Sequence, residues 1–248
     1  MSVAAESPAA ARTVLVTGGG TGIGRAVAAH FAKNGDTVYV TGRREGPLHE
    51  AAQEVGATAL RCDHTDPEQV GALLARLPGR IDVLVNNAGG NTDFDLPDDG
   101  DLAGYARRFQ ANLAANLLSA ALTTHAVRDR LADGGAVVQI GSIAADRGNG
   151  SYGAAKAGLA AWNAGLAGEL GPHGVTANVV SPGYIADTEF FRDNLTGERR
   201  AELVAETATE RAGTPEDIAE AVGFLASPGA RHVTGQVMNV NGGAGRTR

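Results

Sequence analysis

Cysteine, basic residues and long apolar runs are scarce in this sequence, and each scarcity excludes something. The single cysteine, Cys62, makes an intrachain disulfide impossible and is compatible with a reducing compartment. Lysine and arginine number 21 against 28 aspartates and glutamates, and the net charge of -7 argues against non-specific nucleic-acid binding. No apolar run approaches the ~18 residues of a transmembrane helix, and residues 1–11 do not resemble a signal peptide. We therefore expect a cytoplasmic protein without a membrane or nucleic-acid partner.

Metal-ligand pairs and a hydrolase motif are missing too. None of the six histidines stands at metal-ligand spacing from Cys62 or another histidine, so we expect no metal and interpret the histidines as surface or helix-packing residues. Ser142 lies between Gly141 and Ile143, without the second glycine of a G-x-S-x-G turn. Cys62 stands at a strand end, which favours a small buried side chain over a nucleophile.

The 248 residues do show a regular alternation of strand-like and helix-like segments. After a flexible arm at residues 1–11, this pattern predicts one α/β domain at 12–248, a Rossmann fold with a doubly wound, seven-stranded parallel sheet and helices on both faces. The polar segment 90–101 and the segment 184–209 are expected to form loops or a helical flap beside a functional site. A plain pair of surface helices is the alternative. The strands are expected at 12–17, 37–41, 57–61, 81–85, 136–140, 175–180 and 237–240, and the helices at 23–33, 45–55, 67–76, 102–131 and 152–170, with a last helix opening at Thr214.

A glycine-rich turn, from Thr17 to Gly24, follows the first expected strand. Gly18 allows a tight turn, while Gly22 and Gly24 let the backbone approach a pyrophosphate and the helix pack on the sheet. Turns use glycine in any case, so the motif alone is weak. Its place at the first strand–helix junction of a doubly wound pattern indicates a dinucleotide site.

The second expected strand ends in Arg43 and Arg44, where an acidic residue would favour NAD. Two guanidinium groups can instead pair with a 2′-phosphate through charge-assisted hydrogen bonds. The pair therefore predicts a preference for NADP(H), with NAD(H) possible. The alternative is two solvated surface arginines.

Tyr152 and Lys156 are four residues apart on an expected helix and so point from one face of it. An ammonium group near a phenol favours the phenolate, so we expect Lys156 to lower the Tyr152 pKa towards working pH. With the hydroxyl of Ser142 upstream, the three side chains predict hydride chemistry on a carbonyl or an alcohol. A helix-packing tyrosine is the alternative for Tyr152 alone.

These features, in this order, resemble the short-chain dehydrogenase/reductase family from about Thr13 to Gly243, and most closely its 3-oxoacyl-acyl-carrier-protein reductase-like branch. The resemblance implies a cofactor site whose further landmarks are the acid after the third strand, the NNAG segment after the fourth and the PG turn after the sixth. Its cofactor-binding residues would be Gly18, Thr21, Gly22, Ile23, Gly24, Arg43, Arg44, Asp63, Asn87, Ala88, Gly89, Tyr152, Lys156, Pro182, Gly183, Ile185 and Thr188.

The resemblance also implies four catalytic residues, namely Asn116, Ser142, Tyr152 and Lys156. Tyr152 would exchange the proton with the substrate oxygen and Ser142 would orient that oxygen. Lys156 would lower the Tyr152 pKa and bind the nicotinamide ribose, and Asn116 would support a connecting water. Asn112 competes with Asn116 for this last position, and the register favours Asn116.

The chain departs from the family pattern in two places. Ser142 and Tyr152 are only ten residues apart, so the intervening loop is shorter than usual and is expected to open the substrate cleft. Ser151 is an alternative hydroxyl, but its adjacency to Tyr152 turns it to another face of the helix. The threonine expected after the PG turn is replaced by Asp187, and Thr188 comes one residue later.

The resemblance implies a small-molecule carbonyl or alcohol substrate and a homotetramer, with a dimer as the next possibility. It leaves open an epimerase or dehydratase that retains its cofactor, and a non-catalytic NADP-binding protein. The sequence does not single out one substrate class.

Overall fold

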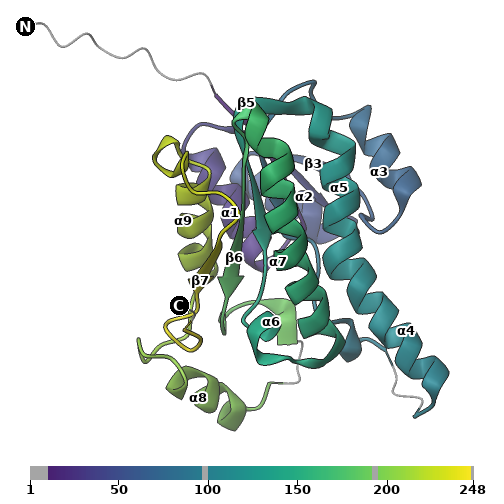
Figure 1. Ribbon diagram of the computed structural model, residues 1–248, viewed down its shortest axis with the longest axis vertical. Coiled ribbons are helices and arrows are strands. Elements are labelled where there is room, and N and C mark those ends of the chain that lie inside the picture. Colours follow the sequence, from purple (N-terminus) through teal and green to yellow (C-terminus); the bar gives the residue numbers. More distant parts are fainter. Residues whose placement is uncertain (1–10, 97–99, 192–194, 247–248) are drawn as a thin grey trace, which may run out of the picture.

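The computed structural model describes residues 11–96, 100–191 and 195–246. The strands of this part of the chain form one seven-stranded sheet (Figure 1). Neighbouring strands all pair in parallel, in the order β3-β2-β1-β4-β5-β6-β7. The strand order reverses between β1 and β4, as it does in doubly wound sheets. The predicted Rossmann fold is therefore confirmed, whereas the arm expected at residues 1–11 lies outside the described residues except for Ala11.

The strands are rich in β-branched residues and are buried by helices on both sides, which is typical of parallel sheets. Val14, Leu15 and Val16 are completely buried, and Val16 pairs with Val40 of one neighbouring strand and Val85 of the other. The strands are β1 (Thr13–Thr17), β2 (Thr37–Gly42), β3 (Thr58–Arg61), β4 (Ile81–Asn86), β5 (Leu131–Ile140), β6 (Thr176–Pro182) and β7 (Val237–Val240).

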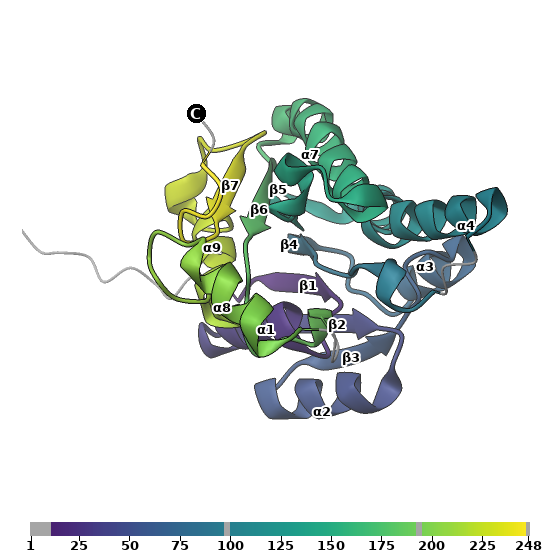
Figure 2. The ribbon, with the colours of Figure 1, turned by 90° about the horizontal axis from the view of Figure 1, so that it is seen from below.

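Helices cover both faces of the sheet (Figure 2), and one apolar cluster joins the helices to each face. Phe31 and Ile218 belong to the cluster under α1, α2 and α9, and Val127 and Leu166 to the cluster under α3, α5 and α7. The helices are α1 (Gly22–Lys33), α2 (Glu45–Val55), α3 (Pro67–Leu74), α4 (Leu102–Leu113), α5 (Ser119–Val127), α6 (Ala144–Arg147), α7 (Gly150–Leu170), α8 (Gly197–Ala205) and α9 (Pro215–Leu225), with short turns η1 (Thr92–Phe94), η2 (Ala114–Leu118), η3 (Arg128–Arg130), η4 (Gly171–His173), η5 (Glu189–Phe191) and η6 (Pro228–Ala230).

The single long helix expected at 102–131 is wrong in detail. A π turn, η2, separates α4 from α5, and η3 then leads into β5, which begins at Leu131 rather than at Ala136. A π turn inserts an extra residue into a helix and is frequent at functional sites. Asn116 lies in this turn.

The reversal of strand order places two loops side by side at the carboxyl ends of β1 and β4. The glycine turn follows β1, and Asn87, Ala88 and Gly89 follow β4. The fold thus brings together the segments that the sequence analysis assigned to one cofactor site. Among the described helices, none has the length and apolar character that crossing a bilayer would require.

Candidate active site

The glycine turn forms a tight cradle between β1 and α1. Gly18 and Gly22 have positive φ angles of 66° and 51°, which side chains rarely allow. A side chain on Gly24 would collide with the Gly18 carbonyl oxygen. Thr21 precedes α1 in an extended conformation and forms no side-chain cap, so the first N–H groups of the helix, including that of Ile23, can bind an anion.

The segment after β4 is fastened to this cradle by Asn87. Its side-chain nitrogen donates to the carbonyl oxygens of Thr17 and Gly18, at 3.0 Å each. The Thr17 hydroxyl oxygen in turn accepts hydrogen bonds from the backbone N–H groups of Asn87 and Ala88, at 3.0 and 2.9 Å. The two loops at the reversal point are therefore held as one rigid unit.

Charged residues meet at the ends of β2 and β3, where an adenosine group is expected. Arg44 forms an ion pair with Glu189 of η5, with 2.6 Å between Nη2 and Oε2. Burial alone would raise the pKa of Asp63, but hydrogen bonds from Thr65 and the nearby charge of Arg43 lower it below its usual value. Asp63 is therefore a carboxylate. Of the two neighbouring arginines, Arg44 is bonded to a carboxylate, whereas Arg43 has no carboxylate bonded to it among the described residues.

His64 is buried between β2 and α5, so it is a helix-packing histidine rather than a surface residue. The Thr123 hydroxyl donates to the Ser119 carbonyl oxygen, so it accepts from Nδ1 of His64 at 2.7 Å. Nε2 of His64 then accepts from the Thr41 hydroxyl at 2.6 Å. Burial lowers the His64 pKa to about 4, so the ring is neutral at pH 7 and ties the ends of β2 and β3 to α5.

Ser142, Tyr152 and Lys156 lie together at the carboxyl end of β5 and the start of α7. Tyr152 and Lys156 are only 7% and 4% exposed. Burial raises the Tyr152 pKa to about 12, and a hydrogen bond with Ser142 opposes this shift. Burial also lowers the Lys156 pKa to about 8.

The expected lowering of the Tyr152 pKa by Lys156 is therefore not found. Lys156 donates from Nζ to the carbonyl oxygen of Ile140 at 2.7 Å, and this nitrogen lies 5.9 Å from the centre of the Tyr152 ring. At that position the ammonium group does not offset the burial of the phenol. Without a cofactor, Tyr152 is thus a protonated phenol over the whole neutral pH range.

The short connection between Ser142 and Tyr152 is closed by the one-turn helix α6. Gly148 and Gly150 have positive φ angles of 67° and 58°, which turn the chain sharply from α6 into α7. A side chain on Gly153 would come within 2.6 Å of the Ala144 carbonyl oxygen, so the two helices touch. The shorter loop therefore keeps Ser142 in contact with Tyr152.

Ser151, the alternative hydroxyl, points away from this group. It accepts a hydrogen bond from the Asn112 side chain at 2.9 Å. Asn112 also accepts from the backbone of Thr92 at 3.1 Å and donates to Asp93 at 3.0 Å, so it holds the loop after β4. Ser151 belongs to this second network.

Asn116 is almost fully buried in the π turn and binds the backbone next to Gly89. Its side chain accepts from the Gly90 N–H at 3.0 Å and donates to the Gly90 carbonyl oxygen at 2.9 Å. A Cβ on Gly89 would lie 2.5 Å from the Asn116 oxygen, which explains the glycine at that position. The structure thus places Asn116 against the NNAG segment and Asn112 further along the same loop.

The loop after β6 folds back over the glycine turn. Pro182 ends β6, and Gly183 packs so closely on Asn241 that a Cβ there would lie 2.8 Å from the Asn241 side chain. Asp187 has a positive φ of 55°. The backbone thus accommodates at Asp187 the one additional residue that this loop has before its threonine. Thr188 then lies beside Gly22, 3.4 Å from where a Cβ on that glycine would be.

An aromatic group covers Tyr152. The Phe190 ring lies 5.5 Å from the Tyr152 ring, and it also contacts Phe94 at 6.1 Å and Phe191 at 4.9 Å between ring centres. Tyr184 lies 5.9 Å from Phe191. Sequence reasoning did not find this arrangement, although the paired phenylalanines in an otherwise polar flap were a visible signal.

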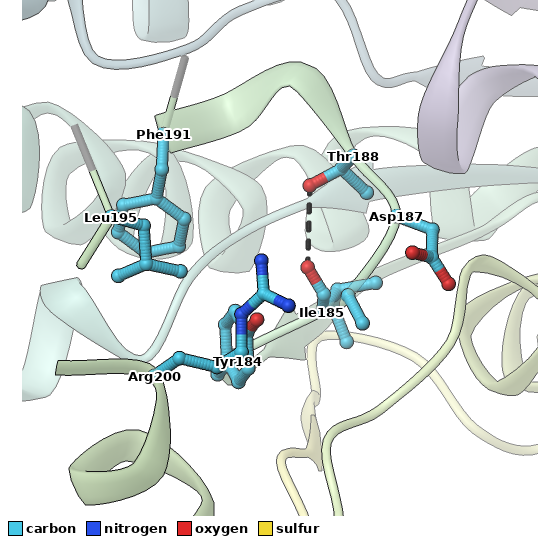
Figure 3. A pocket seen from close by; sticks show the side chains of 8 residues that line it. Tyr184, Ile185, Asp187, Thr188, Phe191, Leu195 and Arg200 are labelled. Carbon is cyan, nitrogen blue, oxygen red and sulfur yellow. Dashed lines mark hydrogen bonds between the residues drawn. The ribbon is translucent and has the colours of Figure 1, made fainter. Parts of the chain in front are cut away.

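A cavity of about 230 Å³ adjoins the aromatic group (Figure 3). Ile185, Thr188 and Phe191 line it, and Thr188 donates its hydroxyl hydrogen to the Ile185 carbonyl oxygen at 3.2 Å. Arg200 reaches in from α8. Of the cofactor-binding set, the structure therefore gathers Ile185 and Thr188 here, and the glycine turn lies on the other side of Thr188.

Known proteins are similar in sequence to this chain over almost its full length. A family model described as enoyl-(acyl carrier protein) reductase matches residues 18–245. The 3-oxoacyl-[acyl-carrier-protein] reductase FabG of Escherichia coli (strain K12) is 36% identical over 241 residues, covering 94% of this chain and 96% of FabG. FabG of Haemophilus influenzae is also 36% identical over 241 residues, covering 94% of this chain and 97% of that protein.

Solved structures agree with the sequence matches. A blue fluorescent protein from a metagenomic library, in complex with NADPH, is similar with a TM-score of 0.84 and 33% identity, covering 95% of this chain and 98% of that chain. A short chain dehydrogenase from Burkholderia cenocepacia J2315, in complex with NADP, has a TM-score of 0.84 and 31% identity, covering 94% and 97%. This chain belongs to the short-chain dehydrogenase/reductase family, in its 3-oxoacyl-acyl-carrier-protein reductase-like branch.

Proposed function

We propose that this protein is an NADP(H)-dependent oxidoreductase that interconverts a carbonyl group and a secondary alcohol. The observation that carries the proposal is the contact between the buried Tyr152 hydroxyl and Ser142, with Lys156 beside them, at the strand ends next to the glycine cradle. A non-catalytic nucleotide-binding protein has no need to bury a phenol, a hydroxyl and an ammonium group together.

The chain offers a fitting site for the cofactor. The start of α1, where the N–H groups have no side-chain acceptor, can hold a pyrophosphate. Arg43 is available for a 2′-phosphate, and Asp63 is a carboxylate that can accept a hydrogen bond from adenine. NADPH and NADP in the similar solved structures support the choice of NADP(H) over NAD(H).

In the reducing direction Tyr152 donates its proton to the carbonyl oxygen of the substrate, which the raised pKa permits because the phenol is fully protonated. Ser142 donates a hydrogen bond to the same oxygen and fixes its position. The bound cofactor supplies the hydride. Lys156 would hold the nicotinamide ribose and return a proton to Tyr152. Asn116, whose side chain bonds to the Gly90 backbone, would support the water that connects Lys156 to solvent.

Replacement of Tyr152 by phenylalanine tests the proposal. The Y152F variant should lose turnover by at least about 100-fold, because it removes the proton donor, while NADPH binding stays unchanged. Oxidation of NADPH would be followed across ketones, diketones, quinones and β-ketoacyl thioesters, and NADPH binding by fluorescence. Tyr105→Phe is the matched control, because this tyrosine is 57% exposed on α4. Full turnover by Y152F would remove Tyr152 from the proposed role.

We further propose that the protein is a cytoplasmic homotetramer. Apolar side chains on the helices α4 to α7 support an interface there, since Tyr105 and Leu118 are 57% and 47% exposed, and Trp162 lies beside a surface cavity. The substrate is a small molecule.

A further inference from the structure

The Phe190 ring lies against Tyr152, the proposed proton donor. Its centre is 5.5 Å from the Tyr152 ring and the two ring planes are tilted by 55°, so a phenyl group already lies beside the proposed proton donor. A phenyl group of a substrate that reaches Tyr152 can take the place of this ring. Phe94 and Phe191, which contact Phe190 at 6.1 and 4.9 Å, then become the walls around the incoming group.

The rings of Phe94 and Phe191 favour a substrate whose main part is flat and apolar. Aromatic rings pack edge to face or offset at centre distances of about 4.5–7 Å, and all the ring contacts around Phe190 fall in this range. The Phe94 and Phe190 rings are nearly perpendicular, at 88°. A substrate phenyl group in place of Phe190 would inherit this geometry, whereas a short alkyl group would leave part of it empty.

Among the described residues that line the adjoining cavity, Arg200 is the one cation. Arg200 extends from α8, and its guanidinium group points into the space between Leu195 and Phe191 on one side and Ile185 and Thr188 on the other (Figure 3). Phe191 is shared between this cavity and the aromatic group, so the cavity begins two ring contacts from Tyr152.

Arg200 differs from the other arginines around the flap in having no acidic partner among the described residues. Arg199 pairs with Glu202 and Arg147 pairs with Glu206, each at 2.6 Å. Asp187, the one carboxylate among the described residues that line the cavity, points away from the guanidinium group (Figure 3). A guanidinium group that faces a cavity without a counter-ion is suited to bind an anion.

We propose that the substrate is a ketone, or the corresponding alcohol, with an aromatic body and a carboxylate group, the body held by Phe94, Phe191 and Tyr184 and the carboxylate held by Arg200. This inference rests on the proposed oxidoreductase function and narrows its substrate class. It assigns Arg200 as a specificity-determining residue, because it binds a part of the substrate that does not react.

Three related compounds test both parts of the proposal. Benzoylpropionate carries the phenyl group and the carboxylate, its methyl ester lacks the charge, and levulinate has a methyl group in place of the phenyl. The dissociation constant of each compound would be measured by calorimetry on the full chain saturated with NADP⁺, and the same compounds would be assayed as ketone substrates with NADPH. Arg200→Gln removes the charge, Arg200→Lys keeps it, and Arg199→Gln is the matched control on the same helix.

The wild-type protein should bind benzoylpropionate about tenfold more tightly than either its ester or levulinate. Arg200→Gln should bring the acid and the ester within about twofold of each other, Arg200→Lys should retain part of the preference, and Arg199→Gln should retain all of it. NADPH affinity is the internal control for the cofactor site.

The proposal is overturned if wild type binds the acid and ester equally, if Arg200→Gln keeps the full preference, or if it weakens NADPH instead. Levulinate binding as tightly as benzoylpropionate would overturn the aromatic part. Because binding is measured without turnover, these results are independent of the proposed reaction. Tight binding of benzoylpropionate with no reduction of any ketone would support the inference and count against the oxidoreductase function.

Discussion

Burial pulls the pKa values of Tyr152 and Lys156 in opposite directions, to about 12 and about 8. Both shifts favour the neutral side chain, because a charged group loses its hydration in the interior. The protonated phenol is the form that reduction needs, and the chain provides it without help from Lys156. Oxidation needs the phenolate, so in that direction the charge of Lys156 has to act on Tyr152 once substrate and cofactor complete the site.

Arg43 and Arg44, adjacent in sequence, have different surroundings. Arg44 is bonded to Glu189 at 2.6 Å, and a 2′-phosphate has to compete with that carboxylate. We expect Arg43→Ala to raise the KM for NADPH about 10–100-fold with little change for NADH, because a charge-assisted hydrogen bond to phosphate is lost.

The Arg44→Ala variant should raise the KM for NADPH less than Arg43→Ala does. In the wild-type protein Arg44 has to leave its exposed ion pair with Glu189 before it can bind the 2′-phosphate, so its net contribution to NADPH binding is smaller. Steady-state kinetics with both cofactors would measure the two variants, with Arg76→Ala, at an exposed position just after α3, as control. Equal losses for NADPH and NADH in Arg43→Ala would contradict the assignment of a 2′-phosphate site.

At the scale of the elements, a neutral His64 connects the ends of β2 and β3 to α5 through its hydrogen bonds to Thr41 and Thr123. Its pKa is about 4 in the folded chain against a usual 6.5, because burial disfavours the charged ring. Between these values the unfolded chain binds the proton and the folded chain does not, so stability falls as pH drops from about 6.5 towards about 4.

Replacement of His64 by asparagine should weaken this dependence on pH. The wild-type protein should lose about 1–3 kcal/mol of unfolding free energy between about pH 7 and about pH 4.5 through this residue, and His64→Asn should lose correspondingly less. Urea unfolding at several pH values would measure it. His125→Asn, at an exposed position of α5, should keep the wild-type slope. An unchanged slope in His64→Asn would show that other groups dominate acid unfolding.

The elements that could be predicted from the sequence are those marked by residues close together in the chain. The glycine turn and the helical pair Tyr152 and Lys156 are local patterns, and the structure places both as expected. The π turn at Asn116 was missed because only one residue distinguishes it from an α-helix of the same composition. The closing of the short Ser142 loop by α6, and the Phe190 ring over Tyr152, depend on contacts between elements that no local pattern encodes.

In the whole molecule, the exposed apolar side chains of the described residues include two groups at separate places. Tyr105 and Leu118 lie on α4 and η2, whereas Phe224 and Val237 lie on α9 and on β7, the last strand of the sheet. A tetramer with dihedral symmetry uses two kinds of isologous interface, and two separate surfaces on each chain meet that requirement.

We therefore expect light scattering to give a mass four times the 25.2 kDa of one chain. Either Leu118→Asp or Phe224→Asp alone should give a dimer, since a buried unpaired carboxylate disrupts only the interface that contains it. The double variant should give a monomer, because both interfaces are then lost. Both side chains are 47% exposed in the single chain, so neither change should unfold the protein, and circular dichroism would check this. A wild-type dimer broken by only one of the two substitutions would instead identify a single interface and exclude the tetramer.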